Sequence, residues 1–205
     1  MTSANDNKAP IKVACVGDSI TFGSGIKDRK NKSYPAQLAR MLGSKYTVNN
    51  FGVGGATLLK KGDKPYWELK RFQSAKKFGP NIVVIKLGTN DSKPQNWQHK
   101  SEFKANYLEF IGIFKNLESK PKVSICYPIP VFAESWGITE EIVKGEVIPL
   151  IKEIANEAKV EVIDCYDALK GKADLVPDNV HPNAGGATLI AESVAKHLGK
   201  SKSQE

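Results

Sequence analysis

Short apolar segments alternate with longer amphipathic segments along most of this chain. The apolar segments predict five strands, at residues 11–17, 47–51, 81–87, 122–127 and 160–164. The third is almost continuous in isoleucine and valine, which is typical of a parallel strand that is covered on both faces. A buried sheet is therefore expected.

The amphipathic segments predict helices. Apolar side chains recur at helical spacing in 33–43, 99–119 and 183–198. The segment 139–158 is also helical in pattern but contains Gly145 and Pro149, so we expect two pieces or a kink there. Strands that alternate with helices in this way predict an α/β fold, with a parallel sheet and helices on both faces.

The size and composition favour one globular domain. The chain has 205 residues, of which 40% are apolar and 25% charged, and this is enough to bury a full core. No internal repeat and no linker rich in proline or serine divides it. We expect the domain to cover residues 11–200, between a disordered tail at 1–10 and a short tail at 201–205.

No apolar run approaches the roughly 20 residues that span a bilayer. The polar segment Met1–Pro10 lacks the apolar stretch of a signal peptide. The protein is therefore either cytoplasmic or exported with its signal already removed, and the compartment stays open. The cysteines Cys15, Cys126 and Cys165 are far apart, which argues against a disulfide framework or a zinc site. We expect them to be small buried hydrophobic residues.

The formal net charge is +8, but lysine is spread along the chain with one dense cluster at 27–32. That cluster also contains Asp28 and Asn31 and is typical of a solvated loop. No nucleic-acid-binding motif accompanies it, so we expect no nucleic-acid partner. A positive potential can still raise the local concentration of an acidic substrate.

The ends of the first two predicted strands carry candidate catalytic groups. Gly17-Asp18-Ser19 places a serine at the carboxyl edge of the sheet, where open α/β sheets bind ligands. A serine nucleophile needs an adjacent base, and taken alone this serine also fits a turn or a helix N-cap. Three glycines within 52–55 form a loop whose N–H groups can donate to a developing oxyanion. A tight turn or a phosphate-binding loop is the alternative, although the first strand–helix turn lacks the G-x-G-x-x-G of dinucleotide folds.

Two later segments complete the set. Asn90 follows the third strand, so its side-chain amide can donate at the same edge, although Asn-Asp is also common turn chemistry. Asp178 precedes His181 by three residues in a loop before the last helix. Its carboxylate can turn back onto the imidazole and fix its tautomer. The other histidines, His99 and His197, fall in predicted surface helices.

With these four segments in this order, residues 11–199 resemble the SGNH (GDSL-type) hydrolase superfamily. The resemblance implies a three-layer α/β/α sandwich around a flavodoxin-like, five-stranded parallel sheet. It implies that Ser19 is the nucleophile, His181 the general base and then acid, and Asp178 the residue that orients His181. The oxyanion hole would comprise the backbone N–H groups of Ser19 and Gly55 and the side-chain amide of Asn90. No metal and no organic cofactor is implied.

Phrases around the aromatic residues resemble bacterial sialate or carbohydrate O-acetylesterases, which implies removal of acetyl from a sugar hydroxyl. The residues expected in the substrate pocket are Asp18, Trp67, Trp97, Phe132 and Trp136. Aromatic side chains stack on sugar rings, but they also pack loops. A lipid esterase or lysophospholipase of the same superfamily and a non-catalytic carbohydrate-binding module stay open as alternatives. The oligomeric state also stays open, since no exposed apolar stripe marks an interface.

Overall fold

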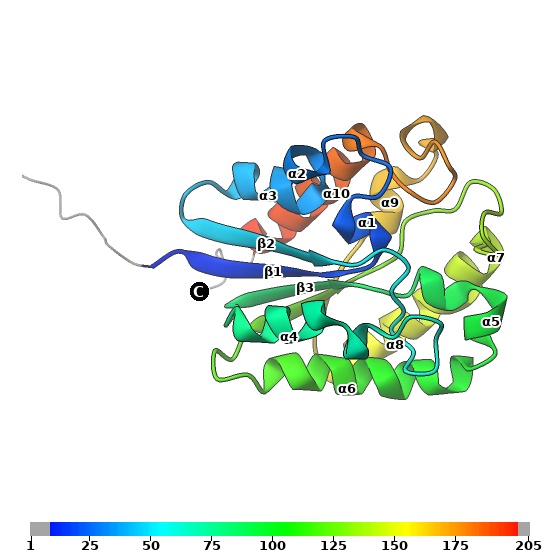
Figure 1. The fold of residues 1–205 in the computed structure, drawn as a ribbon, viewed down its shortest axis with the longest axis horizontal. Helices are drawn as coiled ribbons and strands as arrows, with labels where there is room; N and C mark the ends of the chain where they lie inside the picture. The colour runs from blue at the N-terminus through cyan, green and yellow to red at the C-terminus, as the bar shows by residue number, and fades with distance from the viewer. Residues whose placement is uncertain (1–8, 201–205) are drawn as a thin grey trace, which may run out of the picture.

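The computed structural model describes residues 9–200, where a parallel sheet lies between two layers of helices (Figure 1). The strands are β1 (Ile11–Gly17), β2 (Tyr46–Gly52), β3 (Ile82–Lys86), β4 (Lys122–Cys126) and β5 (Glu161–Ile163). Their spatial order is β2-β1-β3-β4-β5. The predicted α/β/α architecture with five parallel strands is confirmed, and no strand boundary differs from its prediction by more than one residue. Residues 1–8 and 201–205 of the predicted tails lie outside the described residues.

The helices divide between the two faces of the sheet (Figure 1). One layer contains α1 (Ser19–Phe22), α2 (Arg29–Lys32), α3 (Tyr34–Leu42), α9 (Cys165–Leu169) and α10 (Ala184–Lys200). The other contains α4 (Lys70–Lys77), α6 (Phe103–Lys115) and α8 (Ile148–Ala158), and the short helices α5 (Pro94–Trp97) and α7 (Glu140–Ile142) lie near the carboxyl ends of the strands. Within residues 9–200 no helix is both long enough and apolar enough to cross a bilayer.

The segment predicted to break near Gly145 and Pro149 takes an uncommon form. A π-helical turn, Val143–Val147, joins α7 to α8. Pro149 lies in the first turn of α8, directly after the π turn, and the helical backbone runs through both without a break. Gly145 lies within the π turn. The predicted irregularity is therefore a local change of helix type at this segment.

Each face of the sheet has its own apolar core. Along β1, Val13 and Cys15 belong to the core under α3 and α10, whereas Ala14 and Val16 belong to the core over α6. This alternation follows from the two-residue repeat of a strand, and it explains why buried strands read as continuous apolar runs. The cysteine is fully buried, as predicted.

The strand order determines where a ligand can bind. The chain leaves β1 toward β2 on one side and returns to β3 on the other, so the order of the strands reverses at β1. At such a reversal the loops after neighbouring strands diverge and leave a crevice at the carboxyl ends. The loops that follow Gly17, Gly52 and Lys86 all start at this edge, since these three residues are paired across the sheet.

We expect Gly52→Ala to destabilise the protein because helix α1 lies directly against the end of β2. A Cβ at Gly52 would lie 2.2 Å from the Phe22 nitrogen and 2.6 Å from the Thr21 carbonyl carbon, and backbone atoms cannot turn aside. The free energy of unfolding, measured by urea denaturation, should fall by about 1–3 kcal/mol.

Gly112→Ala in α6 is the matched control. A Cβ there meets no atom within 4 Å, so the free energy of unfolding should rise by about 0.5–1 kcal/mol through helix propensity. Equal effects of the two substitutions would contradict the close contact between α1 and β2.

Candidate active site

Ser19 is held at the sheet edge by an abrupt change from strand to helix. β1 ends at Gly17, and Asp18 caps α1 by accepting a hydrogen bond from the Ile20 amide at 2.9 Å. Helix α1 ends after one turn at Gly23, whose φ of +91° favours glycine. Ser19 is thus the first residue of a helix that starts at the carboxyl end of β1.

Asp178 and His181 lie on a tight loop before α10. The Asp178 Oδ1 atom accepts hydrogen bonds from the backbone amides of Val180 at 3.0 Å and His181 at 2.6 Å. Its Oδ2 atom lies 2.9 Å from His181 Nδ1, and His181 Nε2 lies 2.8 Å from Ser19 Oγ. The structure therefore joins three predicted side chains in one hydrogen-bonded row, although Ser19 and His181 are 162 positions apart.

The environment of Asp178 fixes the direction of these hydrogen bonds. Partial burial acts to raise the pKa of this carboxyl group, but hydrogen bonds from His181 and Val180 outweigh it and lower the pKa. An ionised carboxylate only accepts hydrogen bonds, so His181 Nδ1 carries the proton. The Nε2 atom is then free to accept the proton of the Ser19 hydroxyl.

The predicted oxyanion groups face the same space as Ser19 and His181. Ser19, Gly54, Gly55, Asn90 and His181 line one cavity of about 240 Å³. Within residues 9–200, the Ser19 and Gly55 backbone N–H groups donate to no protein acceptor. The Asn90 Nδ2 atom donates one hydrogen bond to the Ala56 carbonyl at 3.1 Å, which leaves its second hydrogen available.

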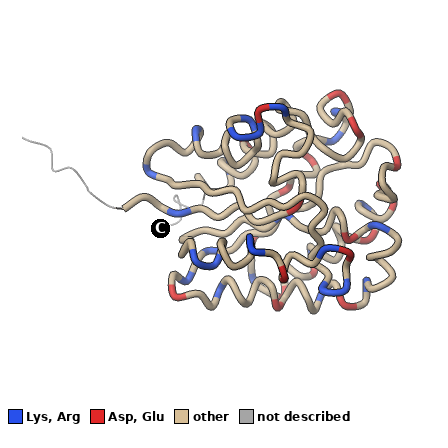
Figure 2. The backbone as a smooth tube through the Cα atoms, viewed as in Figure 1, with Lys and Arg blue, Asp and Glu red and all other residues tan. Residues whose placement is uncertain are grey.

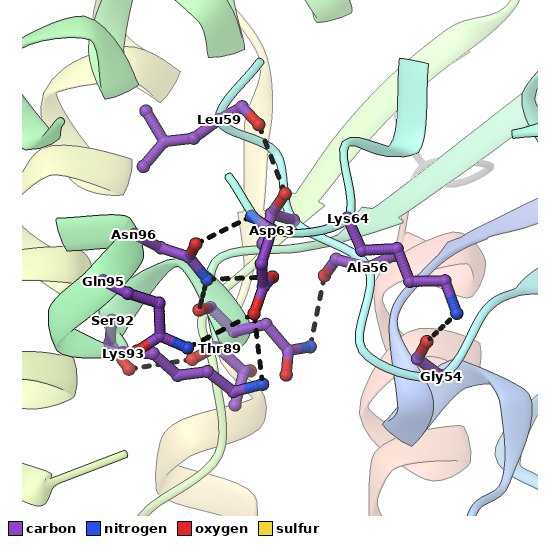
Figure 3. A network of polar contacts seen from close by, with 12 residues as sticks. Gly54, Ala56, Leu59, Asp63, Lys64, Thr89, Ser92, Lys93, Gln95 and Asn96 are labelled. Atoms are coloured by element: carbon purple, nitrogen blue, oxygen red, sulfur yellow. Dashed lines mark hydrogen bonds and ion pairs between the residues drawn. The ribbon is translucent and has the colours of Figure 1, made fainter. Parts of the chain in front are cut away.

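A polar network holds the turn that carries Asn90 (Figure 3). The Asn96 side chain donates to the Asn90 carbonyl at 2.8 Å and to Asp63 Oδ1 at 3.1 Å, and it accepts from the Asp63 amide at 2.8 Å. Figure 3 shows Asn96, Gln95 and Lys93 converging on the Asp63 carboxylate. Asn90, the candidate oxyanion-hole donor, is thus held in position by the loop that carries Asp63 as well as by its own turn.

Asp91 joins the glycine loop to this turn. It is fully buried, and its carboxylate accepts from the amides of Leu58 at 3.0 Å and Leu59 at 2.7 Å. Burial raises the pKa of Asp91 to about 7, although those two amides act to lower it. The carboxylate spans 33 positions of sequence and fixes the segment after Gly55 beside Asn90.

Both polar and apolar side chains line the rest of the cavity wall. Ser24 and Lys93 add a hydroxyl and an ammonium group, whereas Ile138 and Trp136 supply apolar surface. Trp136 is 60% exposed, and its ring centroid lies 5.3 Å from that of His181. The backbone holds this tryptophan at a φ of +55°, which is strained for a bulky residue.

The family model described as the GDSL-like lipase/acylhydrolase family matches residues 15–189, which contain every member of this site. The chain belongs to the GDSL-like lipase/acylhydrolase family. The predicted membership of the GDSL-type hydrolases is confirmed.

Two curated relatives match this GDSL-family chain. An acetylxylan esterase from Xylanibacter ruminicola is 41% identical over 203 residues, which cover 90% of this chain and 42% of that protein. A multidomain esterase from Ruminococcus flavefaciens is 27% identical over 209 residues, which cover 86% of this chain and 27% of that protein. The chain therefore spans less than half the length of either relative.

Solved structures share the fold at lower identity. A carbohydrate acetylesterase from Sinorhizobium meliloti superposes with a TM-score of 0.77 at 21% identity, covering 93% of this chain and 99% of that one. An aryl esterase from M. smegmatis gives a TM-score of 0.76 at 16% identity with the same coverage. Both likenesses extend over the whole GDSL-family domain.

Of the five side chains expected in the substrate pocket, Trp136 alone is among the described residues that line this cavity. Trp67 packs on Phe110 with ring centroids 4.9 Å apart and donates its indole N–H to a loop carbonyl. Trp97 is 6% exposed and donates to Glu146 at 2.9 Å. Both indoles find an apolar neighbour and an acceptor inside the fold, so they pack loops.

The other two expected pocket residues, Asp18 and Phe132, do not line the cavity. Asp18 is fully buried as the cap of α1, so its carboxylate holds the helix that carries Ser19. Phe132 is half-buried against the core on the α10 side of the sheet.

Sequence reasoning missed the side chains that support the site. Lys93 and Ile138 line the cavity, and Asn96 and Asp63 position Asn90. Lys93, Asn96 and Ile138 stand in the phrases around the aromatic residues that resemble O-acetylesterases, but that resemblance assigned them no role. Asp63 belongs to no recognised segment. Within residues 9–200, no three His, Cys, Asp or Glu side chains gather as ligands for a metal ion.

The raised pKa of Asp91 predicts a specific pH dependence of stability. The folded protein binds this proton more tightly than the unfolded chain does, so the carboxyl group favours folding most below about pH 4. That contribution is lost as the pH rises to about 7. Relative to Asp91→Asn, the native protein should lose on the order of 1 kcal/mol of unfolding free energy per pH unit in this window.

Urea denaturation of the native protein and of Asp91→Asn across this pH range measures the difference. The variant has no ionisable group at position 91, so all other titrations cancel in the comparison. A difference that stays constant with pH would contradict the raised pKa.

Proposed function

We propose that this chain is a serine esterase that removes acetyl groups from carbohydrate hydroxyls. The proposal depends on the hydrogen-bonded row Asp178–His181–Ser19. Ser19 and His181 line a small cavity together with Gly55 and Asn90, whose N–H groups are available as donors. Membership of the family supports ester hydrolysis. The 41% identity to an acetylxylan esterase supports acetyl as the acyl group and a sugar as the alcohol.

The proposed reaction has two acyl-transfer steps. Ser19 Oγ attacks the ester carbonyl while its proton passes to His181 Nε2, 2.8 Å away. The imidazolium, stabilised by Asp178, then gives the proton to the departing sugar oxygen, leaving acetyl-Ser19. Water attacks this acyl-enzyme with His181 again as the base, and acetate leaves as the Ser19 hydroxyl is restored.

The negative charge that develops on the carbonyl oxygen needs fixed donors. The N–H groups of Ser19 and Gly55 and the amide of Asn90 supply three, and none of them is charged. Asn96 and Asp91 hold the two loops that carry Gly55 and Asn90. The donors are therefore oriented before the substrate arrives, which is what lowers the barrier.

The size of the cavity favours a short acyl group. A cavity of about 240 Å³ is smaller than the roughly 300–1,000 Å³ typical of pockets for larger ligands. Ile138 and Trp136 are its apolar side chains, and polar residues and glycines make up the rest of the lining. A long acyl chain would leave apolar carbon beside Lys93 and Asn90, so the lining supports an acetylesterase over a lipid esterase.

Hydrolysis of p-nitrophenyl esters from acetyl to decanoyl tests the proposal. The ratio kcat/KM should be highest for acetyl and should fall at least about tenfold by the hexanoyl ester, since longer chains lack apolar contacts. Ser19→Ala should lower kcat by at least about 10⁴-fold on every ester, because nucleophile and base act as a unit.

Release of acetate from acetylated xylo-oligosaccharides is measured in parallel. Acetate release that requires Ser19 supports the proposed substrate class. Activity that rises with acyl chain length would instead favour a lipid substrate, and turnover by Ser19→Ala equal to that of the native protein would exclude the mechanism.

Trp136 is expected to bind the sugar ring. Its exposed face stands beside His181 at the mouth of the cavity, and stacking on a sugar ring contributes about 1–2 kcal/mol. Trp136→Ala should raise KM for acetylated xylo-oligosaccharides about tenfold relative to KM for p-nitrophenyl acetate. Trp136→Phe, which keeps an aromatic face, is the matched control and should recover much of the loss. Equal changes in KM for both substrates would argue against stacking.

A further inference from the structure

Unpaired positive side chains converge on one groove at the edge of the sheet. The groove has a volume of about 830 Å³ and lies between α2, α3 and the edge strand β2. Its charged lining consists of five cations, Lys27, Arg29, Lys30, Arg40 and Arg71, and one anion, Asp28. Arg40 and Arg71 come from α3 and α4, so helices on both faces of the sheet contribute.

Several lysines elsewhere on the surface are neutralised by glutamates, whereas the groove cations form no ion pair with any described residue. Lys60, Lys61 and Lys100 each form an ion pair with a glutamate at 2.7 Å or less, and Lys104 contacts two. Within residues 9–200, none of the five groove cations has an ion-pair partner. Figure 2 shows blue segments gathered around α2 with one red segment, whereas blue and red alternate along the lower helices.

Local contacts hold the cations over the groove although they repel one another. The Arg29 guanidinium lies 4.2 Å from the centroid of the Phe22 ring, and Arg40 Nη1 donates to the Asn31 carbonyl at 2.5 Å. The Asp28 carboxylate accepts from the Asn31 side chain. Like charges held close together favour an anion bound between them.

The loop after α1 lies between the groove and the catalytic cavity. A second hollow of about 470 Å³ shares Lys27 and Asp28 with the groove and is also lined by Gly25. A Cβ at Gly25 would lie 3.9 Å from the His181 Cβ, and the preceding residue, Ser24, lines the catalytic cavity. A chain of sugar units can therefore pass from the cavity over this loop into the groove.

We propose that this groove binds the carboxylate-bearing sugar units of an acidic polysaccharide, while an acetylated unit of the same chain occupies the catalytic cavity. Guanidinium groups match a carboxylate with two parallel hydrogen bonds, and the groove contributes two of them from α2 and α3. The assignment rests on the proposed function and adds a substrate class to it, an acetylated polysaccharide with uronic acid units.

The test compares an acetylated glucuronoxylan with the same polymer after its carboxyl groups have been reduced to alcohols. The native enzyme should show a KM about tenfold lower for the acidic polymer at low ionic strength. In Arg29→Gln/Arg40→Gln the ratio of the two KM values should approach one. Because exposed charges are screened by salt, the preference of the native enzyme should also shrink in about 0.5 M NaCl.

Lys104→Gln/Lys115→Gln is the matched control, because it removes the same charge from α6 on the other face of the sheet. It should keep the preference for the acidic polymer. If this control also lost the preference, net charge would explain the effect and the proposed binding groove would be wrong. Equal KM values for the two polymers in the native enzyme would also contradict the proposal.

A binding measurement separates failure of the groove from failure of the proposed function. Ser19→Ala protein should migrate more slowly in a native gel that contains the acidic polymer, and Ser19→Ala/Arg29→Gln/Arg40→Gln should not. This readout supports the groove even if no acetate is released from any polymer, which would refute only the esterase. Equally strong binding to single-stranded DNA with the same salt dependence would overturn the polysaccharide assignment.

Discussion

The close approach of helix α1 to the sheet is the constraint on which the rest of the site depends. A Cβ at Gly17 would lie 2.2 Å from Thr21 Oγ1 and 2.6 Å from the Lys86 carbonyl oxygen, and one at Gly52 would meet the backbone of α1 at 2.2 Å. Because glycine has no Cβ at position 17 or 52, α1 can start at Ser19, two residues after β1 ends, and pack directly on the sheet. Ser19 then lies at the reversal of strand order, beside the loops of β2 and β3.

Three carboxylates, of which Asp18 and Asp91 are fully buried, organise loops that meet at this edge. Asp18 accepts from the amide of Ile20, Asp91 from two amides after the glycine loop, and Asp178 from the amide of His181. A carboxylate that accepts backbone N–H groups fixes an irregular loop where no helix or strand can satisfy them. In the proposed mechanism this rigidity matters, because the oxyanion donors must be in place before charge develops.

The sequence predicted the sheet and the central polar residues well because both leave local signals. Buried parallel strands are short apolar runs, Ser19 and Asn90 stand just after such runs, and His181 stands in a loop with an aspartate three residues before it. No comparable signal in the sequence shows which aromatic residues line the cavity. Trp67 and Trp97 satisfy their indole N–H groups inside the fold, whereas Trp136 is exposed on a left-handed turn that depends on its surroundings. The cluster at 27–32 reads as a solvated loop, since a linear pattern does not show which cations from other helices converge on it.

The arrangement keeps unpaired charge away from the groups proposed to react. His181 must become an imidazolium as Ser19 attacks, and a nearby free cation would oppose that change. Lys93, which lines the cavity, lies 3.9 Å from the Asp63 carboxylate, so its charge is partly offset where the reaction would occur. None of the five groove cations lines the cavity that holds Ser19 and His181. Recognition of an anionic chain and acyl transfer are thus assigned to different sets of side chains.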